Sequence, residues 1–321
     1  MKLSTSIVCP CGLQNPLVET KDGYLCLDKQ CLHCLDKNQF KNYQGIPLLV
    51  SFDKCDTICA ESDYADIQPK VKIKDLKIGV FSVFKKKILD YIFNDNKVTI
   101  KNCKIFIKTL TVKRKNPRIL VIGGGTLGDG TDQLWSHGDL SITSIDIYPS
   151  STTDYIADAH YLPFQDGSFD GVWIQAVLEH VASPERVVQE IHRVLAHKGI
   201  VYAETPFMQQ VHMGAYDFQR YTMLGHRYLF KKFNQFDIGP TQGPGVALAW
   251  SIRYFLWALF RSEKIAIYLS IPFLIIFRFL DKFIDKRAFW DSSSGVYFMG
   301  VKEKELVVMQ NELPSKYLGM Q

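Results

Sequence analysis

The stretch that decides the fold is residues 117–130, which read P-R-I-L-V-I-G-G-G-T-L-G-D-G. Residues 119–122 form a short run of apolar, mostly β-branched side chains, and this run predicts a buried strand. Gly123, Gly125 and Gly128 follow with the spacing G-x-G-x-x-G. Glycine has no Cβ and adopts positive φ without strain, so a sharp turn here lets a nucleotide-like ligand approach the backbone. The meaning of this motif depends on the elements that follow it.

Strands and helices alternate after the glycine turn. Further strands are expected at 142–147, 155–157, 171–174 and 200–203. A helix is expected to begin with Ser183 as N-cap and Pro184 as first residue, and to end at Gly199. This alternation predicts a doubly wound, mostly parallel sheet with its ligand at the carboxyl ends of the strands. Asp146 lies near the end of the second strand, 18 residues beyond Gly128, where an acidic residue can accept hydrogen bonds from a ribose.

The order of these segments is specific. The chain reads I-L-V-I-G-G-G-T-L-G, S-I-D-I, A-D-A-H-Y-L-P-F-Q-D-G-S-F-D-G-V-W, A-V-L-E-H-V and P-E-R-V-V-Q-E-I-H-R-V-L-A-H-K-G, over about 100 contiguous residues. It resembles the class I S-adenosylmethionine-dependent methyltransferases, in the subgroup that acts on small molecules, quinones and lipids. The resemblance implies an α/β fold with a Rossmann-like seven-stranded methyltransferase sheet of order 3-2-1-4-5-7-6, and S-adenosyl-L-methionine as the cofactor.

The resemblance also implies cofactor-binding residues, which are Gly123, Gly125, Asp146, Asp158, Ala159 and Gln175. The two glycines would pass under the methionine part, and the acid after the second strand would hold the ribose. Asp158 would accept the adenine amino group beside the backbone N–H of Ala159. Gln175 would face the methionine or the sulfonium.

Two further groups of polar residues follow the fourth and fifth strands. Glu179, His180 and His212 are the candidates for a general base, which methyl transfer needs when the acceptor is a hydroxyl or a carbon acid. The candidate substrate-binding residues are Asp217, Arg220 and Tyr221. The spacing H-x-x-x-x-D-x-x-R-Y resembles a segment found in methyltransferases encoded with glycan and lipid assembly enzymes. In the alternative interpretation, Asp217 and Arg220 pair to fix a loop and His180 satisfies a backbone carbonyl.

Residues 1–52 are rich in cysteine. The first residues contain no apolar run, so we expect no secretory signal, and reduced cysteines then favour metal over disulfides. The candidate ligands of one structural Zn²⁺ are Cys9, Cys11, Cys31 and Cys34, with Cys26 or His33 as replacements. The segment resembles the small zinc-ribbon domains that precede some methyltransferases, in which a G-I-P-x-L tail closes the ribbon. The alternative is a metal-free β segment with buried thiols.

Residues 53–116 are expected to form a basic, partly helical linker region. Between residues 70 and 115 there are 14 Lys and Arg against three Asp. Residues 76–93 have the spacing of an amphipathic helix, and residues 98–112 are ambiguous between strand and helix. The excess of positive charge suits a membrane surface or nucleic acid, or it is simply a solvated helix face.

The last part of the methyltransferase domain, 117–305, is expected to hold an insertion. Strands are predicted at 236–238 and 296–301, and an apolar helical insertion, 241–291, separates them. Its apolar runs are shorter than the about 20 residues that a membrane-spanning helix needs. The sixth strand ends on the cofactor side of the sheet, so the insertion is expected at the mouth of the active site. A polar tail, 306–321, follows.

An apolar lid at this place suits a lipid-linked or long-chain acceptor. The predicted function is therefore methyl transfer to a lipid-linked or glycan-type small-molecule acceptor by a cytoplasmic enzyme. Peripheral contact with the inner face of the membrane is expected through residues 246–287, and the alternative is a pair of buried helices. A ribosomal RNA methyltransferase with zinc-finger targeting is less favoured, because no aromatic-rich basic face is evident. A non-catalytic, methyltransferase-like binding module is the third possibility.

Overall fold

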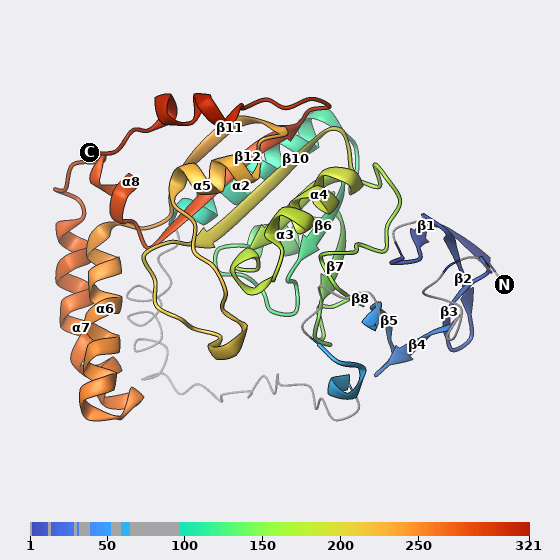
Figure 1. Cartoon of the computed structure of the whole chain (residues 1–321), viewed down its shortest axis with the longest axis horizontal. Coiled ribbons are helices and arrows are strands. Elements are labelled where there is room, and N and C mark those ends of the chain that lie inside the picture. Colours follow the sequence, from blue (N-terminus) through green and yellow to red (C-terminus); the bar gives the residue numbers. More distant parts are fainter. Residues whose placement is uncertain (1, 12–13, 29–30, 32–38, 53–58, 65–96) are drawn as a thin grey trace.

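The computed structural model describes residues 2–11, 14–28, 31, 39–52, 59–64 and 97–321. One sheet of twelve strands runs through these residues in the order β1-β2-β3-β4-β5-β8-β7-β6-β9-β10-β12-β11. Helices cover both faces of its central part (Figure 1). The expected amphipathic helix at 76–93 lies outside the described residues.

The central part of the sheet begins with the run of apolar residues before the glycine turn. Its strands are β6 (Arg118–Ile122), β7 (Ser141–Asp146), β8 (Tyr155–Ala157), β9 (Phe169–Gln175), β10 (Leu195–Pro206), β11 (Phe233–Pro240) and β12 (Gly295–Lys302). The first five are parallel, and β12 is antiparallel to both β10 and β11. Numbered along the chain, these seven strands have the order 3-2-1-4-5-7-6. The prediction of a sheet of seven strands was nevertheless wrong, because five N-terminal strands extend it to twelve.

The N-terminal strands are β1 (Lys2–Val8), β2 (Pro16–Thr20), β3 (Gly23–Cys26), β4 (Gln39–Tyr43) and β5 (Ile46–Leu49). They pair antiparallel in sequence order. Gly23, at the hairpin between β2 and β3, has a φ of +143°, and a Cβ there would lie 1.9 Å from the carbonyl oxygen of Phe40. β5 then pairs in parallel with β8, with Leu48 opposite Ile156. The Gly-Ile-Pro segment therefore joins the N-terminal strands to the central sheet, in addition to closing them.

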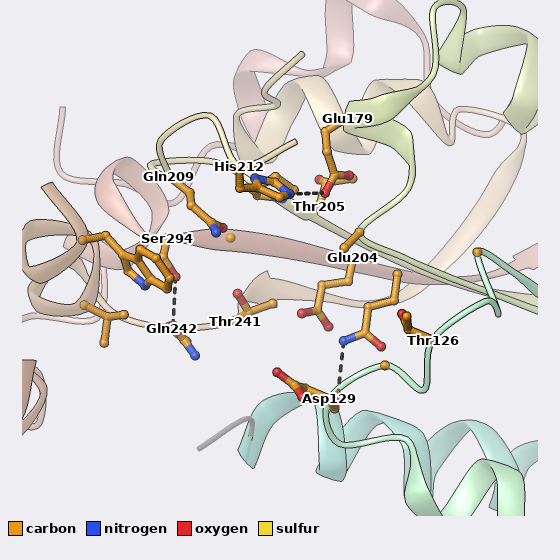
Figure 2. Close-up of a pocket in the computed structure, with 18 of the residues that line it drawn as sticks. Thr126, Asp129, Glu179, Glu204, Thr205, Gln209, His212, Thr241, Gln242 and Ser294 are labelled. Atoms are coloured by element: carbon orange, nitrogen blue, oxygen red, sulfur yellow. Dashed lines mark hydrogen bonds and ion pairs between the residues drawn. The ribbon is translucent and has the colours of Figure 1, made fainter. Parts of the chain in front are cut away.

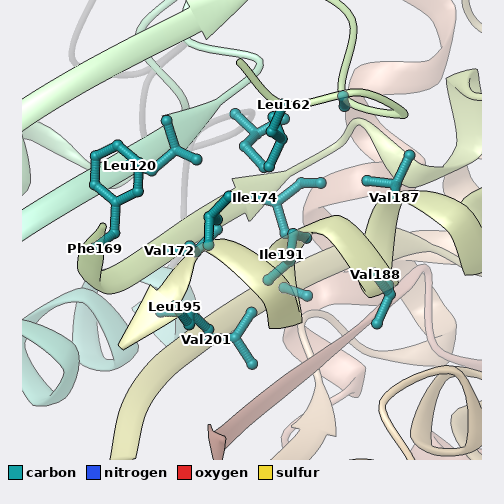
Figure 3. Packing of buried hydrophobic residues seen from close by; sticks show 14 of the residues in the cluster. Leu120, Leu162, Phe169, Val172, Ile174, Val187, Val188, Ile191, Leu195 and Val201 are labelled. Atoms are coloured by element: carbon teal, nitrogen blue, oxygen red, sulfur yellow. The ribbon is translucent and has the colours of Figure 1, made fainter. Parts of the chain in front are cut away.

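Two apolar cores lie on the two faces of the sheet. The helices that cover the central sheet are α2 (Lys97–Lys113), α3 (Asp132–Ser136), α4 (Pro184–Val194) and α5 (Met223–Leu229). Short 3₁₀ turns lie at η2 (Glu61–Tyr64), η3 (Leu178–His180), η4 (Gly214–Tyr216), η5 (Gln310–Glu312) and η6 (Pro314–Lys316). On one face, Val172 and Ile174 of β9 pack with Ile191 of α4 (Figure 3). On the other face, the rings of Phe106 in α2 and Trp173 in β9 are 5.4 Å apart.

Three details differ from the sequence predictions. The ambiguous segment after residue 97 is the helix α2, and its buried face belongs to the sheet core, so the domain begins before residue 117. α4 ends at Val194 because Leu195 is already extended and starts β10. The Ser183 side chain makes no capping hydrogen bond; its backbone N–H donates to His160 Nε2 at 3.1 Å instead.

The insertion between β11 and β12 is a helical hairpin. It consists of α6 (Pro244–Phe260) and α7 (Glu263–Leu280), followed by α8 (Ala288–Ser292). α6 and α7 lie side by side at one end of the molecule (orange in Figure 1). Their buried seam contains Val246, Ala249 and Leu274. Among the described residues, none of the helices combines the length and the apolar character required to cross a membrane.

Candidate active site

The glycine turn is shaped by close contacts with neighbouring strand ends. Gly123 has a φ of +80°, and a Cβ at this position would lie 2.2 Å from Val177 Cγ2. The backbone N–H of Gly125 donates to Asp146 Oδ2 at 2.8 Å. A Cβ on Gly125 would lie 2.6 Å from that same oxygen. These contacts explain why the turn needs glycine, and they hold Asp146 against it.

An apolar pocket of about 420 Å³ opens between the glycine turn and the ends of β7 and β8. Its lining includes Asp146, Ile147, Asp158, Ala159, Val181 and Met213. Burial raises the pKa of Asp146. The backbone N–H groups of Tyr148 and Gly125 donate hydrogen bonds to the carboxylate, which offsets part of this rise. Asp158 Oδ1 accepts the backbone N–H of His160 at 2.8 Å and lies 2.6 Å from His160 Nδ1.

This pocket has the features that a nucleoside requires. It has an apolar wall for a flat base, one acid at the end of β7 and a second acid just after β8. The lining includes Gly123, whose missing Cβ leaves the backbone open to close approach. Four of the six predicted cofactor-binding residues line it: Gly123, Asp146, Asp158 and Ala159. Gly125 is in contact with Asp146 behind the turn.

A second, polar pocket of about 320 Å³ continues from the first one (Figure 2). The two pockets share Gly123, Thr126, Ala176 and His212. Gln175, the sixth predicted residue, lies here and donates to the backbone oxygen of Asp129 at 3.2 Å. The polar lining also includes Glu204, Thr241, Gln242 and Ser294. The α6–α7 hairpin supplies Val246, Trp250, Leu274 and Arg278. The insertion therefore forms one wall of this pocket.

Glu204 is a pocket residue that the sequence reasoning missed. Its Oε2 accepts hydrogen bonds from the Tyr202 hydroxyl at 2.5 Å and from Thr99 Oγ1 at 2.9 Å. Burial raises the pKa of Glu204. Its position near the carboxyl end of β10 was an available signal, because ligands of such sheets bind at the strand ends. Thr99 comes from α2, which could not be assigned to this core from the sequence.

The predicted catalytic residues Glu179, His180 and His212 lie together. His180 Nε2 and His212 Nε2 are 3.1 Å apart, and Glu179 Oε1 lies 3.6 Å and 3.7 Å from them, respectively. Glu179 is fully buried, and burial raises its pKa to about 8. Burial lowers the pKa of His180, whose Nδ1 lies 2.6 Å from the carbonyl oxygen of Tyr216. This last contact is the backbone role foreseen as the alternative for His180.

The predicted substrate-binding residues lie in the loop between β10 and α5. Arg220 forms an ion pair with Asp217 and also donates to the backbone oxygens of Gln209, Gln210 and Gln219. Hydrogen bonds from Arg220 lower the pKa of Asp217 to about 2. The Tyr221 hydroxyl donates to Gln219 Oε1 at 2.9 Å. These contacts favour the loop-fixing interpretation, and none of Asp217, Arg220 and Tyr221 lines the two joined pockets.

The N-terminal cysteines form a separate group. Cys9, Cys26 and Cys31 have sulfur atoms close enough to share one ion, and Cys9 Sγ and Cys31 Sγ are 3.8 Å apart. Cys11 is buried nearby but does not belong to this group, and its Sγ lies 3.9 Å from Asn15 Nδ2. Cys34 and His33 lie outside the described residues. The structure thus brings Cys26, the foreseen replacement, to the place predicted for Cys11.

A comparison with protein families agrees with this geometry. Residues 120–203 match a family model described as a methyltransferase domain. A comparison with curated proteins gave no match.

Three solved structures illustrate the more distant similarities. One is a putative sarcosine dimethylglycine methyltransferase from Galdieria sulphuraria (14% identity, 65% of this chain and 86% of that chain, TM-score 0.43). Another is phosphoethanolamine N-methyltransferase 2 of Haemonchus contortus, in complex with phosphomonomethylethanolamine and S-adenosylhomocysteine (16% identity, 70% of this chain and 57% of that chain, TM-score 0.42). The third is 1,6-didemethyltoxoflavin-N1-methyltransferase from Burkholderia thailandensis, with bound 1,6-didemethyltoxoflavin and S-adenosylhomocysteine (12% identity, 77% of this chain and 92% of that chain, TM-score 0.42).

The family match covers the strands that carry the glycine turn, both acids of the apolar pocket and the Glu179–His180 turn. The sheet order and the apolar pocket with its two acids agree with this match. The chain therefore contains a methyltransferase domain, and the enzyme is an S-adenosylmethionine-dependent methyltransferase.

Proposed function

We propose that this methyltransferase acts on a hydroxyl group of a lipid-linked or glycan-type acceptor at a membrane surface. The observation that carries the proposal is the double role of the α6–α7 hairpin. One side of the hairpin lines the polar pocket with Val246, Trp250 and Leu274. Its other sides expose large apolar side chains to solvent.

The polar pocket suits a polyhydroxylated acceptor head. Hydroxyl, amide and carboxylate groups of Thr126, Gln175, Glu204, Thr241 and Gln242 line its floor. Such groups donate and accept hydrogen bonds in the pattern that sugar hydroxyls require. Arg278 lines the side formed by the hairpin and would meet an anionic group, such as a phosphate, between the head and the lipid chain.

In this proposal the cofactor supplies an electrophilic methyl group on a sulfonium. Asp146, Asp158 and the backbone of Ala159 would bind its nucleoside in the apolar pocket, with Gly123, Gly125 and Gln175 along its methionine part. The protein holds the acceptor oxygen in line with the methyl group and excludes water. Glu179, His180 and His212 lie where the two pockets join, and this cluster would promote the loss of the hydroxyl proton. Asp217, Arg220 and Tyr221 would position His212 through their loop.

The exposed face of the hairpin supports membrane contact. Phe255 of α6, Tyr268 of α7 and Phe283, three residues after α7, are 67%, 67% and 72% exposed, respectively. Basic residues flank them: Arg253, Arg261, Lys264, Lys282 and Lys286. An apolar surface with a basic border lies on anionic lipid without crossing it. We propose a cytoplasmic enzyme that touches the inner face of the membrane through residues 246–287.

The N-terminal strands are proposed to be a zinc ribbon that holds one structural ion. The 3.8 Å between Cys9 Sγ and Cys31 Sγ equals the edge of a tetrahedron of sulfur atoms about 2.3 Å from Zn²⁺. Cys26 would supply a third thiolate, and Cys34 remains the predicted fourth ligand. Zinc would stabilise a segment whose apolar core is small.

The alternatives lead to different products. A ribosomal RNA methyltransferase would use the basic residues before α2 for RNA, but it leaves the hairpin's apolar face unexplained. A non-catalytic module would bind cofactor without turnover.

The experiment that separates these functions follows the methyl group itself. Cell lysate is incubated with the enzyme and S-adenosylmethionine labelled in the methyl group, and the label is then divided among lipid, RNA and protein fractions. The proposal expects enzyme-dependent label in the lipid or glycolipid fraction, lost in Asp146→Ala. Label in RNA alone would support the second function, and no transfer at all despite cofactor binding would support the third.

A further inference from the structure

The cluster of Glu179, His180 and His212 has a feature that proton transfer alone leaves unexplained. His180 Nδ1 lies 2.6 Å from the carbonyl oxygen of Tyr216, so this nitrogen carries a proton and donates it. His212 Nδ1 lies 3.3 Å from Asp217 Oδ2, which favours the proton on Nδ1 again. A ring that carries its single proton on Nδ1 presents an unprotonated Nε2. The two Nε2 nitrogens face each other at 3.1 Å.

Two lone pairs at this distance repel each other unless a positive charge lies between them. The third member of the cluster strengthens this requirement. Glu179 is fully buried, and within the described part of the chain neither of its carboxylate oxygens has a hydrogen-bond partner. A buried carboxylate without a partner is costly unless a proton or a cation neutralises it. Its Oε1 lies 3.6 Å from His180 Nε2 and 3.7 Å from His212 Nε2, and Figure 2 shows the contact with His212.

We infer that Glu179 Oε1, His180 Nε2 and His212 Nε2 bind a first-row divalent metal cation. The three sides of their triangle are 3.1, 3.6 and 3.7 Å. A point about 2 Å from all three atoms exists, which matches metal–nitrogen and metal–oxygen bond lengths in such sites. Two imidazoles and one carboxylate are a ligand set that leaves coordination positions open.

The surroundings of the cluster are those of a metal site. Metal-binding imidazoles are usually oriented by an acceptor on the other ring nitrogen. The Tyr216 carbonyl oxygen is the acceptor for His180 Nδ1, and Asp217 Oδ2 is the acceptor for His212 Nδ1. Arg220 in turn holds Asp217 by an ion pair and by hydrogen bonds. Asp217 and Arg220 are thus positioning residues, which accounts for their tight pairing outside the two joined pockets.

The cation would lie where the two pockets meet, since His212 lines both of them, Glu179 the polar one and His180 the apolar one. Its open positions would bind the acceptor hydroxyl oxygen, a step that rests on the proposed function. A cation bound there would lower the pKa of that hydroxyl group, whose proton would pass to water. The oxygen then forms a bond to the methyl carbon, the carbon–sulfur bond breaks, and its electron pair remains on sulfur.

Cation binding is tested without activity. The full-length protein is treated with a chelator, dialysed and titrated with Mn²⁺, with free Mn²⁺ measured by electron paramagnetic resonance. Mn²⁺ is chosen because thiolates bind it poorly, so the N-terminal cysteines do not compete. We expect one Mn²⁺ per chain, bound at least tenfold more weakly by Glu179→Gln and by His212→Gln. The exposed His197→Gln is the matched control and keeps the wild-type affinity.

Binding of S-adenosylhomocysteine by each variant, measured by calorimetry, shows that its fold is intact. The inference is overturned if the wild type binds no Mn²⁺ at millimolar concentration, or if Glu179→Gln and His212→Gln bind it like the wild type. In that case a shared proton joins the two histidines. Labelled lipid without Mn²⁺ binding would support the proposed function and contradict the cation site. Mn²⁺ binding without any labelled lipid or glycolipid would support the cation site and contradict the proposed function.

Discussion

The Asp146 carboxylate and the Gly125 backbone N–H are joined by a hydrogen bond of 2.8 Å, so the glycine turn and the second strand of the central sheet position each other. This relationship predicts that a substitution at either residue weakens cofactor binding. Asp146→Ala removes the acceptor for the turn and the proposed ribose ligand. Gly125→Ala places a Cβ 2.6 Å from Asp146 Oδ2, so the carboxylate must move.

We expect each of these variants to bind S-adenosylhomocysteine at least tenfold more weakly than the wild type, which calorimetry measures. A tenfold loss corresponds to about 1.4 kcal/mol. Asp139→Ala, at an exposed position before β7, is the control and should bind normally. Wild-type affinity in Asp146→Ala would show that the cofactor does not use this acid.

The exposed face of the α6–α7 hairpin predicts binding to anionic lipid vesicles. The triple variant Phe255→Ser, Tyr268→Ser and Phe283→Ser removes three large exposed apolar side chains. Because burial of each contributes up to about 1.5–3 kcal/mol, we expect vesicle partitioning to fall by more than tenfold in cosedimentation. The matched control replaces exposed apolar residues elsewhere: Val112→Ser, Leu306→Ser and Leu318→Ser. Equal loss in both triple variants would argue against a specific membrane face.

The packing of α2 against the sheet predicts that this helix is essential to the domain. Phe106 is fully buried against Trp173, so Phe106→Ala leaves a cavity in the core. We expect the free energy of unfolding to fall by about 3–5 kcal/mol in denaturant titrations. Lys108→Ala, on the exposed side of the same helix, should change it by less than about 0.5 kcal/mol. A small effect at Phe106 would mean that the domain begins near residue 117 after all.

A buried histidine predicts how stability depends on pH. His226 is fully buried, neither ring nitrogen has a hydrogen-bond partner within the described residues, and burial lowers its pKa from 6.5 to about 3. Above pH 6.5 the side chain is neutral in both the folded and the unfolded state. Below pH 6.5 only the unfolded state binds the proton, so the folded state loses about 1.4 kcal/mol per pH unit down to about pH 3.

The test compares the wild type with His226→Phe, which removes this titration. Between pH 7 and pH 5 we expect the wild type to lose about 2 kcal/mol more than the variant in chemical denaturation. Parallel pH profiles of the two proteins would contradict the assignment.

The N-terminal cysteines predict which thiols hold zinc. Metal analysis of the purified protein should give one Zn²⁺ per chain, lost in Cys26→Ser and retained in Cys11→Ser, because only Cys26 belongs to the cysteine group that the structure brings together. Cys59→Ser, a buried cysteine outside that group, is the control. Loss of zinc in Cys11→Ser alone would restore the ligand set predicted from spacing.

The sequence by itself determined what is local and periodic. The apolar run at 119–122 and the glycines after it predicted the buried strand β6 and the turn that follows it, and the alternation of segments predicted a mostly parallel central sheet. The strand and the turn are confirmed, because buried parallel strands have continuous apolar runs and because glycine adopts the positive φ that the turn needs.

Only the tertiary structure decided which distant segments meet. Spacing favoured Cys11, but the strands bring Cys26 to Cys9 and Cys31, since side-chain direction in a hairpin depends on register. Thr99 reaches Glu204, and His212 reaches His180 and Glu179, through packing between elements far apart in the chain. The position of the α6–α7 hairpin as a pocket wall with an exposed apolar face is of the same kind. Hydropathy shows that those helices are apolar, whereas only their packing shows which sides remain open.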